Sequence, residues 1–511
     1  MAKISQNNPK EKDEISLRLE VEKQINEHSK IEEHLKTIGK YEVAVFYIES
    51  LINKKMYSDN VLGQLEKLAN RQEKFSSEKD LINAFADEVA VSSTEMVQNA
   101  NEAIDKILGG SAVVVCENYA LHLPIKNIEK RAISEPPTSR VIKGPREGFV
   151  EDVATNLNLI RRRLKTTNLC IKDHYVGRQT NTQISVVYLD GIAQNSIVKN
   201  IEKRLDAIDI DGIIDSYYIE SFLEDKKLKF FKRIGNTEKP DILCAKLLEG
   251  RVGILVDGSP IALTAPYVLF EDLQSSEDYY TIPAMATFAR FMRLIGLFFA
   301  ILMPGIYVAL QSYNYRILPI NFLITLLSSI EGLSIPPLIE ILIVLFLFEI
   351  ITEASLQMPN ALTMALSIIG ALALGNTAVD AGIISPPSIV VVAVSSVALY
   401  IIPDQISETR LLRILFTTLG GVIGLYGIVM ALIIVAGYMS SIKSFGVPYF
   451  TPFAPHIKSD IKDGFIKKPV QDMTTRPKLI SGMNKKRQRS KQISDLNLTL
   501  GENHKEKGAG K

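Results

Sequence analysis

The stretch LFLFEIITEASLQMP, residues 345–359, lies in the most apolar third of this 511-residue chain. Nine of its fifteen residues are hydrophobic, yet Glu349 and Glu353 stand four positions apart, on one face of a helix. A carboxylate near the centre of a bilayer costs about 2.5–3.5 kcal/mol on insertion scales. We therefore expect a membrane helix in which Glu349 faces protein or water. Glu353 either shares that environment or lies at the membrane surface, where the helix ends before Pro359.

Polar and apolar residues are segregated along the chain. Residues 1–285 carry charges throughout, and residues 286–440 are dominated by Leu, Ile, Val, Ala, Phe, Gly and Pro. No apolar segment resembling a signal peptide opens the sequence, so we expect the N-terminal domain to stay cytoplasmic. The predicted fold class is a multidomain membrane protein, with an N-terminal cytoplasmic α plus α/β domain followed by an α-helical transmembrane bundle of four to six segments.

Charge, cysteine content and motifs argue against several functional classes. The net charge is +1, which gives no indication of a nucleic-acid partner, and the three cysteines lie far apart, as free thiols do. The six histidines do not cluster at metal-ligand spacing. We find no P-loop, GxGxxG, GxSxG or HExxH motif. The sequence therefore predicts no catalytic residue, metal site or cofactor.

The membrane block contains six apolar runs. Their lengths can be compared with the roughly 20 residues needed to cross the hydrocarbon core of a bilayer. Arg290 and Arg293 precede most of the first run, and the residues after Ser440 hold fifteen Lys and Arg against six Asp and Glu. Basic flanks favour the cytoplasmic side, so both ends are expected there, with an even number of crossings. Six segments are favoured, with four as the alternative. The runs are 288–310, 317–330, 336–351, 361–384, 388–403 and 411–439.

Hydrophobic periodicity subdivides the rest of the chain. We expect residues 1–40 to be a largely solvated, partly helical polar extension, 41–108 a helical subdomain, 109–285 an α/β subdomain and 441–511 a basic cytoplasmic tail. Within the α/β part, 151–164 reads as a helix, because acids occupy its first turn and arginines its last. The stretch 240–250 begins with proline and ends with glycine, as helices do, and 251–266 reads as a hairpin turning at Asp257-Gly258.

Six separated stretches form a recognisable set. They are EPPTSRVIKGPREGFVEDVATNLNLIRRRL (135–164), RVGILVDGSPIALTAP (251–266), SSEDYY (275–280), FEIITEASLQMP (348–359), GNTAVDAGIIS (375–385) and SFGVPYFTPFAP (444–455). Together they resemble the spore germination receptor A-subunit family, the GerA type of endospore-forming bacteria. The resemblance covers roughly residues 41–470.

This resemblance implies a role and partners. Such A subunits act with a transporter-like B subunit that binds the nutrient and with a lipoprotein C subunit, in the spore inner membrane. They are thought to assemble as a pentamer around a pore that passes monovalent cations. Membrane lipid is then a further partner, and the basic tail suits anionic lipid.

Departures from the family pattern direct the search for charge partners. In the acidic run the family has FExLREAxxRxP, but Thr352 and Gln357 replace its two arginines here. We therefore expect Glu349 and Glu353 to find partners outside their own helix. Arg410 and Arg413, before the last apolar run, are the candidates. Together with Glu340, these charges are predicted to serve gating or subunit contact.

The run 361–384 is the predicted ion pathway. It combines small residues with Asn376 and Asp380, which share one helical face. One aspartate from each of several identical subunits would form an acidic collar that attracts cations. Val379 and Ile383 are expected to supply a hydrophobic constriction. The alternative is that Asp380 only marks the end of the helix.

Arg146 and Glu147 lie in a polar, Pro/Gly-rich loop. They are expected either to clamp a neighbouring subunit or domain, or to fix the turn into the 151–164 helix.

Three functions remain in competition. The first is a channel-forming receptor subunit. The second is a secondary transporter with a midplane site at Pro336-Pro337 and Pro386-Pro387, although 286–440 shows no inverted repeat. The third is a membrane-anchored scaffold, which would not need four acids in its anchor. The channel subunit is the prediction.

Overall fold

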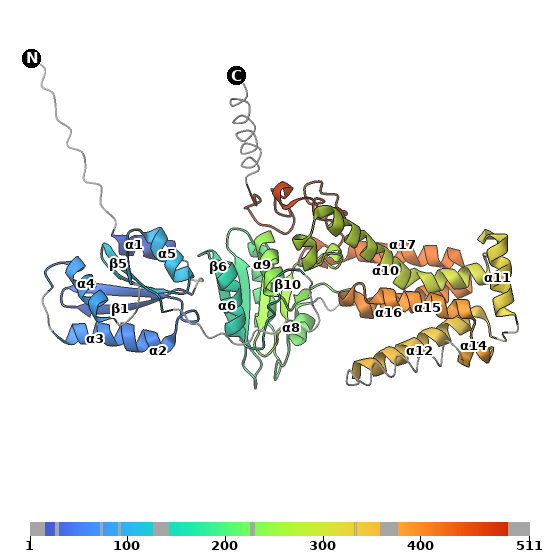
Figure 1. The fold of residues 1–511 in the computed structure, drawn as a ribbon, viewed down its shortest axis with the longest axis horizontal. Coiled ribbons are helices and arrows are strands. Elements are labelled where there is room, and N and C mark those ends of the chain that lie inside the picture. Colours follow the sequence, from blue (N-terminus) through green and yellow to red (C-terminus); the bar gives the residue numbers. More distant parts are fainter. Residues whose placement is uncertain are drawn as a thin grey trace, which may run out of the picture.

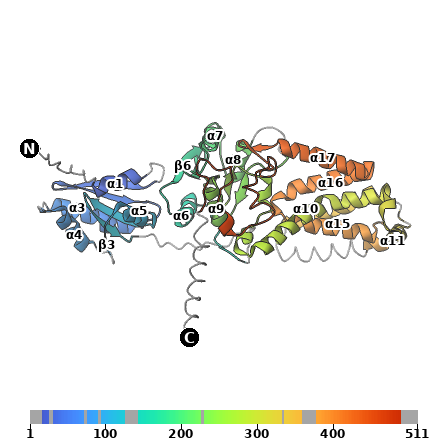
Figure 2. The same cartoon turned by 90° about the horizontal axis from the view of Figure 1, so that it is seen from above.

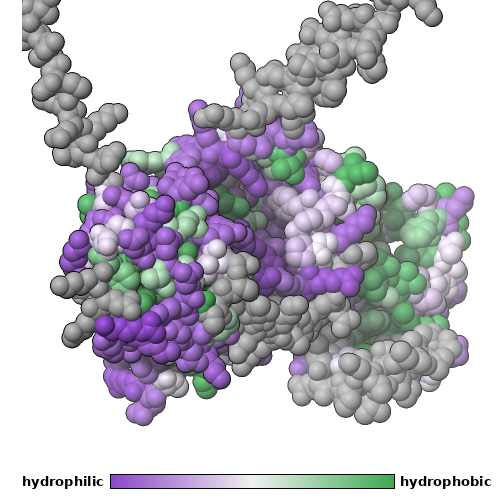
Figure 3. Space-filling model, turned by 60° about the vertical axis from the view of Figure 1, so that its left-hand side comes forward, coloured by the Kyte–Doolittle hydropathy of each residue, from purple (hydrophilic) through white to green (hydrophobic). Residues whose placement is uncertain are grey.

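Two α/β units, a helical bundle and a returning C-terminal segment make up the computed structural model (Figure 1). The units lie side by side, and the bundle follows on the far side of the second unit. Figure 3 shows hydrophobic side chains gathered on the bundle and hydrophilic ones on the units. The described residues are 16–25, 30–71, 75–89, 94–125, 143–224, 230–331, 333, 335–357 and 377–488.

The first unit, residues 16–125, is a five-stranded antiparallel sheet covered on both faces. Its strand order is β1-β2-β4-β5-β3. One face packs on α1 (Leu17–Gln24) and α5 (Ala100–Leu108). The other packs on α2 (Lys54–Met56), the π-helix Tyr57–Leu62, α3 (Gly63–Asn70) and α4 (Glu78–Glu88). The strands are β1 (Glu32–Ile38), β2 (Tyr41–Tyr47), β3 (Glu95–Val97), β4 (Ala112–Cys116) and β5 (Tyr119–Leu123).

Three expectations about this unit are wrong. Residues 17–24 and 32–38 belong to the fold and are not a solvated extension, because β1 is a charged edge strand that sequence patterning takes for a polar tail. Tyr41–Tyr47 is a strand rather than a helix. Its central residues are buried continuously since helices cover both faces of the sheet, and such a run lacks period-two alternation. The boundary at 108 also cuts the sheet, because β4 pairs with β2.

The second unit, residues 143–266, repeats this topology. Its order is β6-β7-β9-β10-β8, again antiparallel, which matches the first unit strand for strand. Helices α6 (Val153–Arg163) and α9 (Pro240–Glu249) cover one face, and α7 (Asn195–Asp206) and α8 (Ser216–Leu223) cover the other. The strands are β6 (Leu169–Val176), β7 (Thr182–Leu189), β8 (Gly235–Thr237), β9 (Val252–Val256) and β10 (Ala262–Ala265).

Local predictions hold in this unit. The α6 helix begins after Asp152, whose side chain accepts a hydrogen bond from Thr155 N at 2.8 Å, and its last turn carries three arginines. The α9 helix starts at Pro240 and ends at Gly250, whose φ of 102° is left-handed and suits glycine. The β9–β10 hairpin is confirmed.

Short 3-10 turns at Leu269–Glu271 and Ser276–Tyr280 lead into the bundle, residues 283–441. By length and composition, α10 is the single described helix that could span a bilayer on its own. The consecutive helices α15 and α16, with a bend of 109° between them, make a second candidate if the pair is counted as one span. The helices are α10 (Pro283–Ser312), α11 (Ile320–Ile330), α12 (Pro337–Gln357), α14 (Ala378–Asp380), α15 (Pro386–Leu399), α16 (Ile406–Ile423) and α17 (Leu425–Ser441).

The run 411–439 is two helices rather than one, which corrects the expected segmentation. The chain reverses at Gly424, whose φ is 75°, between α16 and α17. Helices α10 and α16 approach closely because glycines face each other. A Cβ added to Gly420 would lie 2.4 Å from the carbonyl oxygen of Gly305. The predicted run 361–384 is described only from Thr377 onward.

The C-terminal segment, residues 442–488, is ordered and returns to the second unit, where the sequence predicted only a basic tail. It begins with the β11 (Lys443–Ser444) and β12 (Val447–Pro448) pair. Gln194 Nε2 donates to the carbonyl oxygens of Leu479 and Ser481 at 2.9 and 3.2 Å. Figure 2 shows the segment lying over this unit at the near end of the bundle. Residues 489–511 lie outside the described part.

Candidate functional site

An ion triplet, in which one residue is buried and two are half-buried, links three helices of the bundle. Glu349 on α12 lies 3.2 Å from Arg410 Nε and 2.5 Å from Arg413 Nη2, both on α16. Arg413 is 1% exposed, and its Nη1 donates to Ser396 Oγ of α15 at 3.1 Å. The two arginines are three positions apart and therefore share a face of α16. The prediction that they are the partners of Glu349 is confirmed.

The triplet carries one negative and two positive charges, so it is not self-neutral. Removing a partner from a buried ion pair leaves an uncompensated charge, which is strongly destabilising. Hydroxyls of Ser395 and Ser396 meet part of the hydrogen-bonding requirement of Arg413, at 3.4 and 3.1 Å. The arrangement thus makes the relative positions of α12, α15 and α16 depend on one carboxylate.

Glu340 lies at the other end of α12 and caps a helix. It is 1% exposed, and its Oε1 accepts hydrogen bonds from Ser385 N and Ser385 Oγ, both at 2.7 Å. Ser385 immediately precedes α15, so the carboxylate sits at the positive end of that helix dipole. Ser388 and Tyr307 extend the network, with Ser388 Oγ 2.9 Å from Ser385 Oγ, which accepts this hydrogen bond. The predicted gating or contact role of Glu340 stays a prediction.

Glu353 is exposed, one turn beyond Glu349. It ends a line of exposed residues along α12, spaced by four and three positions. These residues are Ile339, Ile343, Phe346 and Ile350. The two glutamates of the opening stretch therefore have different surroundings: one is held inside the bundle and the other faces outward.

The predicted ion-pathway residues are only partly described. Asp380, the last residue of α14, is exposed, Val379 is half-buried and Ile383 is 48% exposed. Asn376 lies outside the described residues, so the face it was expected to share with Asp380 stays a prediction. Asp380 precedes Ser385 by five residues and therefore lies at the end of the bundle where α15 begins.

Glu147 pairs within its own chain. Its carboxylate forms an ion pair with Arg163, and Arg162 Nη2 lies 3.9 Å away, both in the last turn of α6. This geometry supports the turn-fixing alternative for Glu147. Arg146 is exposed. In the same loop, Gly144 has a φ of 118°, and an added Cβ would lie 2.7 Å from the Tyr280 ring, just before α10.

A second cluster of charges, which the sequence did not predict, holds three parts of the chain together. Arg290 Nε donates to Asp278 Oδ2 at 2.9 Å, and its Nη1 lies 2.9 Å from Asp463 Oδ1. Arg293 also binds Asp278, with Nη2 to Oδ1 at 2.9 Å. Lys467 Nζ donates to the backbone carbonyl of Asp278. We call Asp278, Arg290, Arg293, Asp463 and Lys467 the junction cluster.

Burial governs the electrostatics of the junction cluster. Asp278 is 2% exposed and Arg290 0%. Burial by itself would raise the pKa of Asp278, but hydrogen bonds from Arg293 and Arg290 keep that pKa below its ordinary value. Burial lowers the pKa of Lys467, whose ammonium lies 5.0 Å from the Tyr279 ring centre. The cluster joins the 3-10 turn Ser276–Tyr280 that follows the second unit, the first turns of α10 and the C-terminal segment.

Sequence reasoning used Arg290 and Arg293 only as markers of orientation. Asp278 stood within the quoted motif SSEDYY, which was the one available signal. Asp463 lies 173 residues from Arg290, in a segment predicted to be a tail.

Comparison with known families matches this architecture over most of its length. The model of the Bacillus/Clostridium GerA spore germination protein family matches residues 18–479. The chain belongs to the GerA family. It is 32% identical over 450 residues to spore germination protein KA of Bacillus subtilis (strain 168), covering 87% of this chain and 82% of that protein.

A second relative and one solved structure are also similar to parts of this chain. Spore germination protein GerLA of Bacillus cereus is 35% identical over 383 residues, covering 74% of this chain and 78% of that protein. The crystal structure of the N-terminal domain of the A subunit of the Bacillus megaterium spore germinant receptor GerK3 is 28% identical. It covers 49% of this chain and 92% of that domain, with a TM-score of 0.37.

The quoted GerA motifs fall at the contacts between parts. SSEDYY supplies Asp278 to the junction cluster, and FEIITEASLQMP supplies Glu349 to the triplet. The motif RVGILVDGSPIALTAP forms the β9–β10 hairpin, and its Arg251 is 4% exposed. Arg251 Nη1 donates to the carbonyl oxygen of Pro266 at 2.6 Å and pairs with Glu271.

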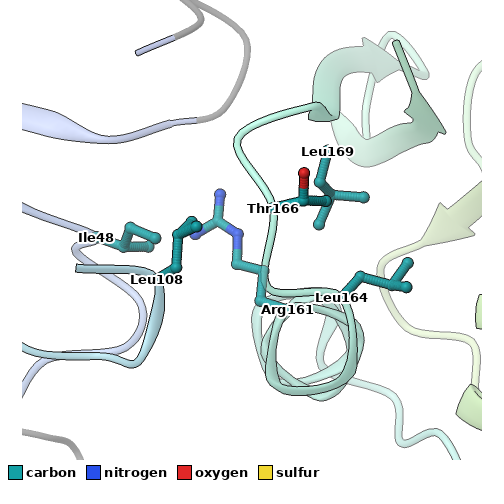
Figure 4. Close-up of a pocket in the computed structure, with 6 residues that line it drawn as sticks. All are labelled: Ile48, Leu108, Arg161, Leu164, Thr166 and Leu169. Carbon is teal, nitrogen blue, oxygen red and sulfur yellow. The ribbon is translucent and has the colours of Figure 1, made fainter. Parts of the chain in front are cut away.

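A small hollow separates the two α/β units of this GerA-family chain. Figure 4 shows Arg161 extending from α6 toward Leu108 of the first unit. Arg161 is 6% exposed, burial lowers its pKa to about 10, and its Nη1 donates to Ser50 Oγ at 3.0 Å. Its surroundings suit packing between the units rather than chemistry. No group of three or more candidate metal ligands occurs among the described residues.

Proposed function

We propose that this GerA-family chain is the A-type subunit of a nutrient-germinant receptor in the spore inner membrane, where several copies form a gated cation channel that triggers germination. The observation that best supports this proposal is the triplet, in which Arg410 and Arg413 bind the carboxylate of Glu349 within an apolar bundle. An inert anchor has no need of such a group, because buried charges in a membrane are costly. A gate can use it, since moving one helix breaks or remakes the ion pairs.

Assembly with further copies is supported by the outward face of α12. Ile339, Ile343, Phe346 and Ile350 are exposed along it and end at the exposed carboxylate of Glu353. We propose that a neighbouring copy of the chain packs on this apolar face, and that a pentamer is the closed ring.

The ion pathway is proposed to run past Asp380. It is exposed at the end of the bundle where α15 begins, and a ring of such aspartates would concentrate monovalent cations. Asn376 and Val379 would line the path beside it, with Ile383 as part of the constriction. Glu340, Arg146 and Glu147 are proposed to position helices and loops around this path.

Orientation and partners complete the proposal. The C-terminal segment binds the second unit, which supports placing both on one side of the membrane, the cytoplasmic side, with an even number of crossings. A transporter-like B subunit would bind the nutrient, and a lipoprotein C subunit would complete the receptor. A secondary transporter subunit or a signalling scaffold of the same complex is the alternative.

The test is cation flux from vesicles that contain this chain with its B and C partners. The Asp380→Asn variant is compared with wild type and with Asp404→Asn, a matched control at an exposed acid between α15 and α16. We expect nutrient to open a conductance, and Asp380→Asn but not Asp404→Asn to change its size or its preference for cations. Flux that neither variant alters would refute the pathway but keep the channel. Uptake of labelled solute without ion flux would favour the transporter.

A further inference from the structure

The outer face of α8 is apolar and aromatic although α8 lies in a water-soluble unit. Its inner residues, Ile219 and Leu223, are fully buried in the sheet core. Its outer side chains are exposed over 39–71% of their surface. They are Ile214, Tyr217, Tyr218 and Phe222, which we call the α8 face. Ile214 precedes the helix, and the other three lie on it.

Two observations place the α8 face toward the bundle. The α8 helix covers the sheet face that also packs against Phe445, Val447 and Ile480 of the C-terminal segment, which follows α17. The opposite sheet face carries Asp173, which pairs with Lys30 of the first unit. In Figure 1, α8 accordingly lies on the side of the second unit that is turned toward the bundle.

A residue shortly after α8 contacts the end of α17 that lies beside the second unit. Phe231, eight residues beyond Leu223, packs on Tyr438 in the last two turns of α17, with ring centres 6.0 Å apart. Arg233 accepts a hydrogen bond at its carbonyl oxygen from Ser444 Oγ at 2.7 Å. The α8 face therefore stands at the level where the apolar surface of the bundle ends and the soluble part begins.

We propose that the α8 face rests on the bilayer, with its aromatic rings among the lipid headgroups. Tyrosine is enriched at this depth because its ring is apolar and its hydroxyl stays hydrated. A short amphipathic helix lies in the interface in the same way, with its apolar face in the headgroup region. The contact fixes the tilt of the second unit, and with it the junction cluster, relative to the membrane. This inference rests on the proposed membrane location.

The absence of tryptophan from the chain allows a direct test. Single Tyr217→Trp and Phe222→Trp variants of the full chain are placed in nanodiscs made with brominated phospholipids, which quench nearby tryptophan. Tyr175→Trp is the matched aqueous control: Tyr175 is 61% exposed on β6, on the sheet face away from α8. Phe298→Trp, at a 49% exposed site within α10, is the membrane control.

We expect the brominated lipid to reduce the emission of Trp variants at 217 and 222 by about two-fold, since an interfacial helix sits roughly 5–10 Å into the headgroup boundary. Emission should be unchanged for Tyr175→Trp and reduced most for Phe298→Trp. If only Phe298→Trp is quenched, the inference is wrong and the membrane location stands. If Phe298→Trp is not quenched either, the membrane location itself fails. Shielding of both α8 variants from aqueous iodide without lipid quenching means that a protein surface covers the face, which also overturns the proposal.

Discussion

The junction cluster and the triplet are both groups of acids and arginines, but they differ in how deeply the carboxylate is buried and in how many hydrogen bonds it accepts. In the junction cluster, Asp278 is 2% exposed and receives hydrogen bonds from Arg290, Arg293 and Ser275 N. In the triplet, the Glu349 side chain is 27% exposed and accepts one hydrogen bond, from Arg413. Each group has one more cation than acids, but the cations of the junction cluster also donate to backbone carbonyls, whereas Arg413 of the triplet donates to serine hydroxyls.

This difference suggests different roles. A buried carboxylate with several charge-assisted donors is held in one geometry, because any movement breaks several strong hydrogen bonds together. A carboxylate shared between two arginines can shift from one to the other at lower cost. We therefore interpret the junction cluster as a clamp between the second unit, the C-terminal segment and the bundle, and the triplet as the contact that rearranges more easily.

The largest effect is expected for Asp278→Asn. It leaves the buried Arg290 and the half-buried Arg293 without their common carboxylate, which should cost about 3–5 kcal/mol in the free energy of unfolding. The measurement is the yield and thermal midpoint of the full chain in nanodiscs. Asp472→Asn, at an exposed site in the C-terminal segment, is the control and should match wild type. A variant as stable as the control would show that the junction cluster does not act as a clamp.

Glu349→Gln is expected to rank second, at about 3 kcal/mol, since two arginines lose their carboxylate but part of the site is open. Adding Arg413→Gln should recover part of the loss, because residues of one ion network are coupled by roughly 0.5–3 kcal/mol. Thermal midpoints of the single and double variants give the coupling. Glu353→Gln, exposed on the same helix, is the comparison and should change stability little. Simple additivity of the two losses would show that the triplet is not a unit.

Gly305→Ala should cost about 1–3 kcal/mol, through overpacking. An added Cβ would lie 2.6 Å from the carbonyl oxygen of Phe416, so α10 and α16 must separate. These helices carry Arg290 and Arg413, and the change therefore strains both clusters together. Gly437→Ala on α17, with nothing within 4 Å of its Cβ position, is the matched control. Equal thermal midpoints for the two alanine variants would contradict the close contact.

The smallest effect is expected in the pH dependence of stability, and it comes from a third contact. There, Tyr267 and Gln405 donate hydrogen bonds to Asp272. Burial raises the pKa of Asp272 to about 7 from an ordinary 3.8. Between these values the folded chain keeps a proton that the unfolded chain has lost, so this carboxyl makes stability fall as pH rises toward 7. Asp272→Asn should remove that part of the decline, measured as thermal midpoints at pH 5.5 and 7.5. An identical pH dependence in the variant would show that Asp272 does not titrate in this range.

Local features of the fold were predictable from the sequence, and long-range ones were not. The caps of α6 and α9 and the β9–β10 hairpin follow from neighbouring residues. The strand Tyr41–Tyr47 was missed, because burial on both faces removes the alternation that identifies a strand. The shared strand order of the two units was missed too, since it is a property of pairing between distant segments.

The candidate site likewise has features that the sequence predicts and features that it does not. The sequence by itself determined that residues 286–440 are apolar, that Glu349 needs a partner, and that Arg410 and Arg413 are available, because composition and helical spacing are local properties. Only the tertiary structure decided that Glu340 caps α15 and that Asp463 reaches Arg290 across 173 residues. It also divided 411–439 at Gly424. Such contacts depend on where whole helices and units pack, and no short window of sequence contains that information.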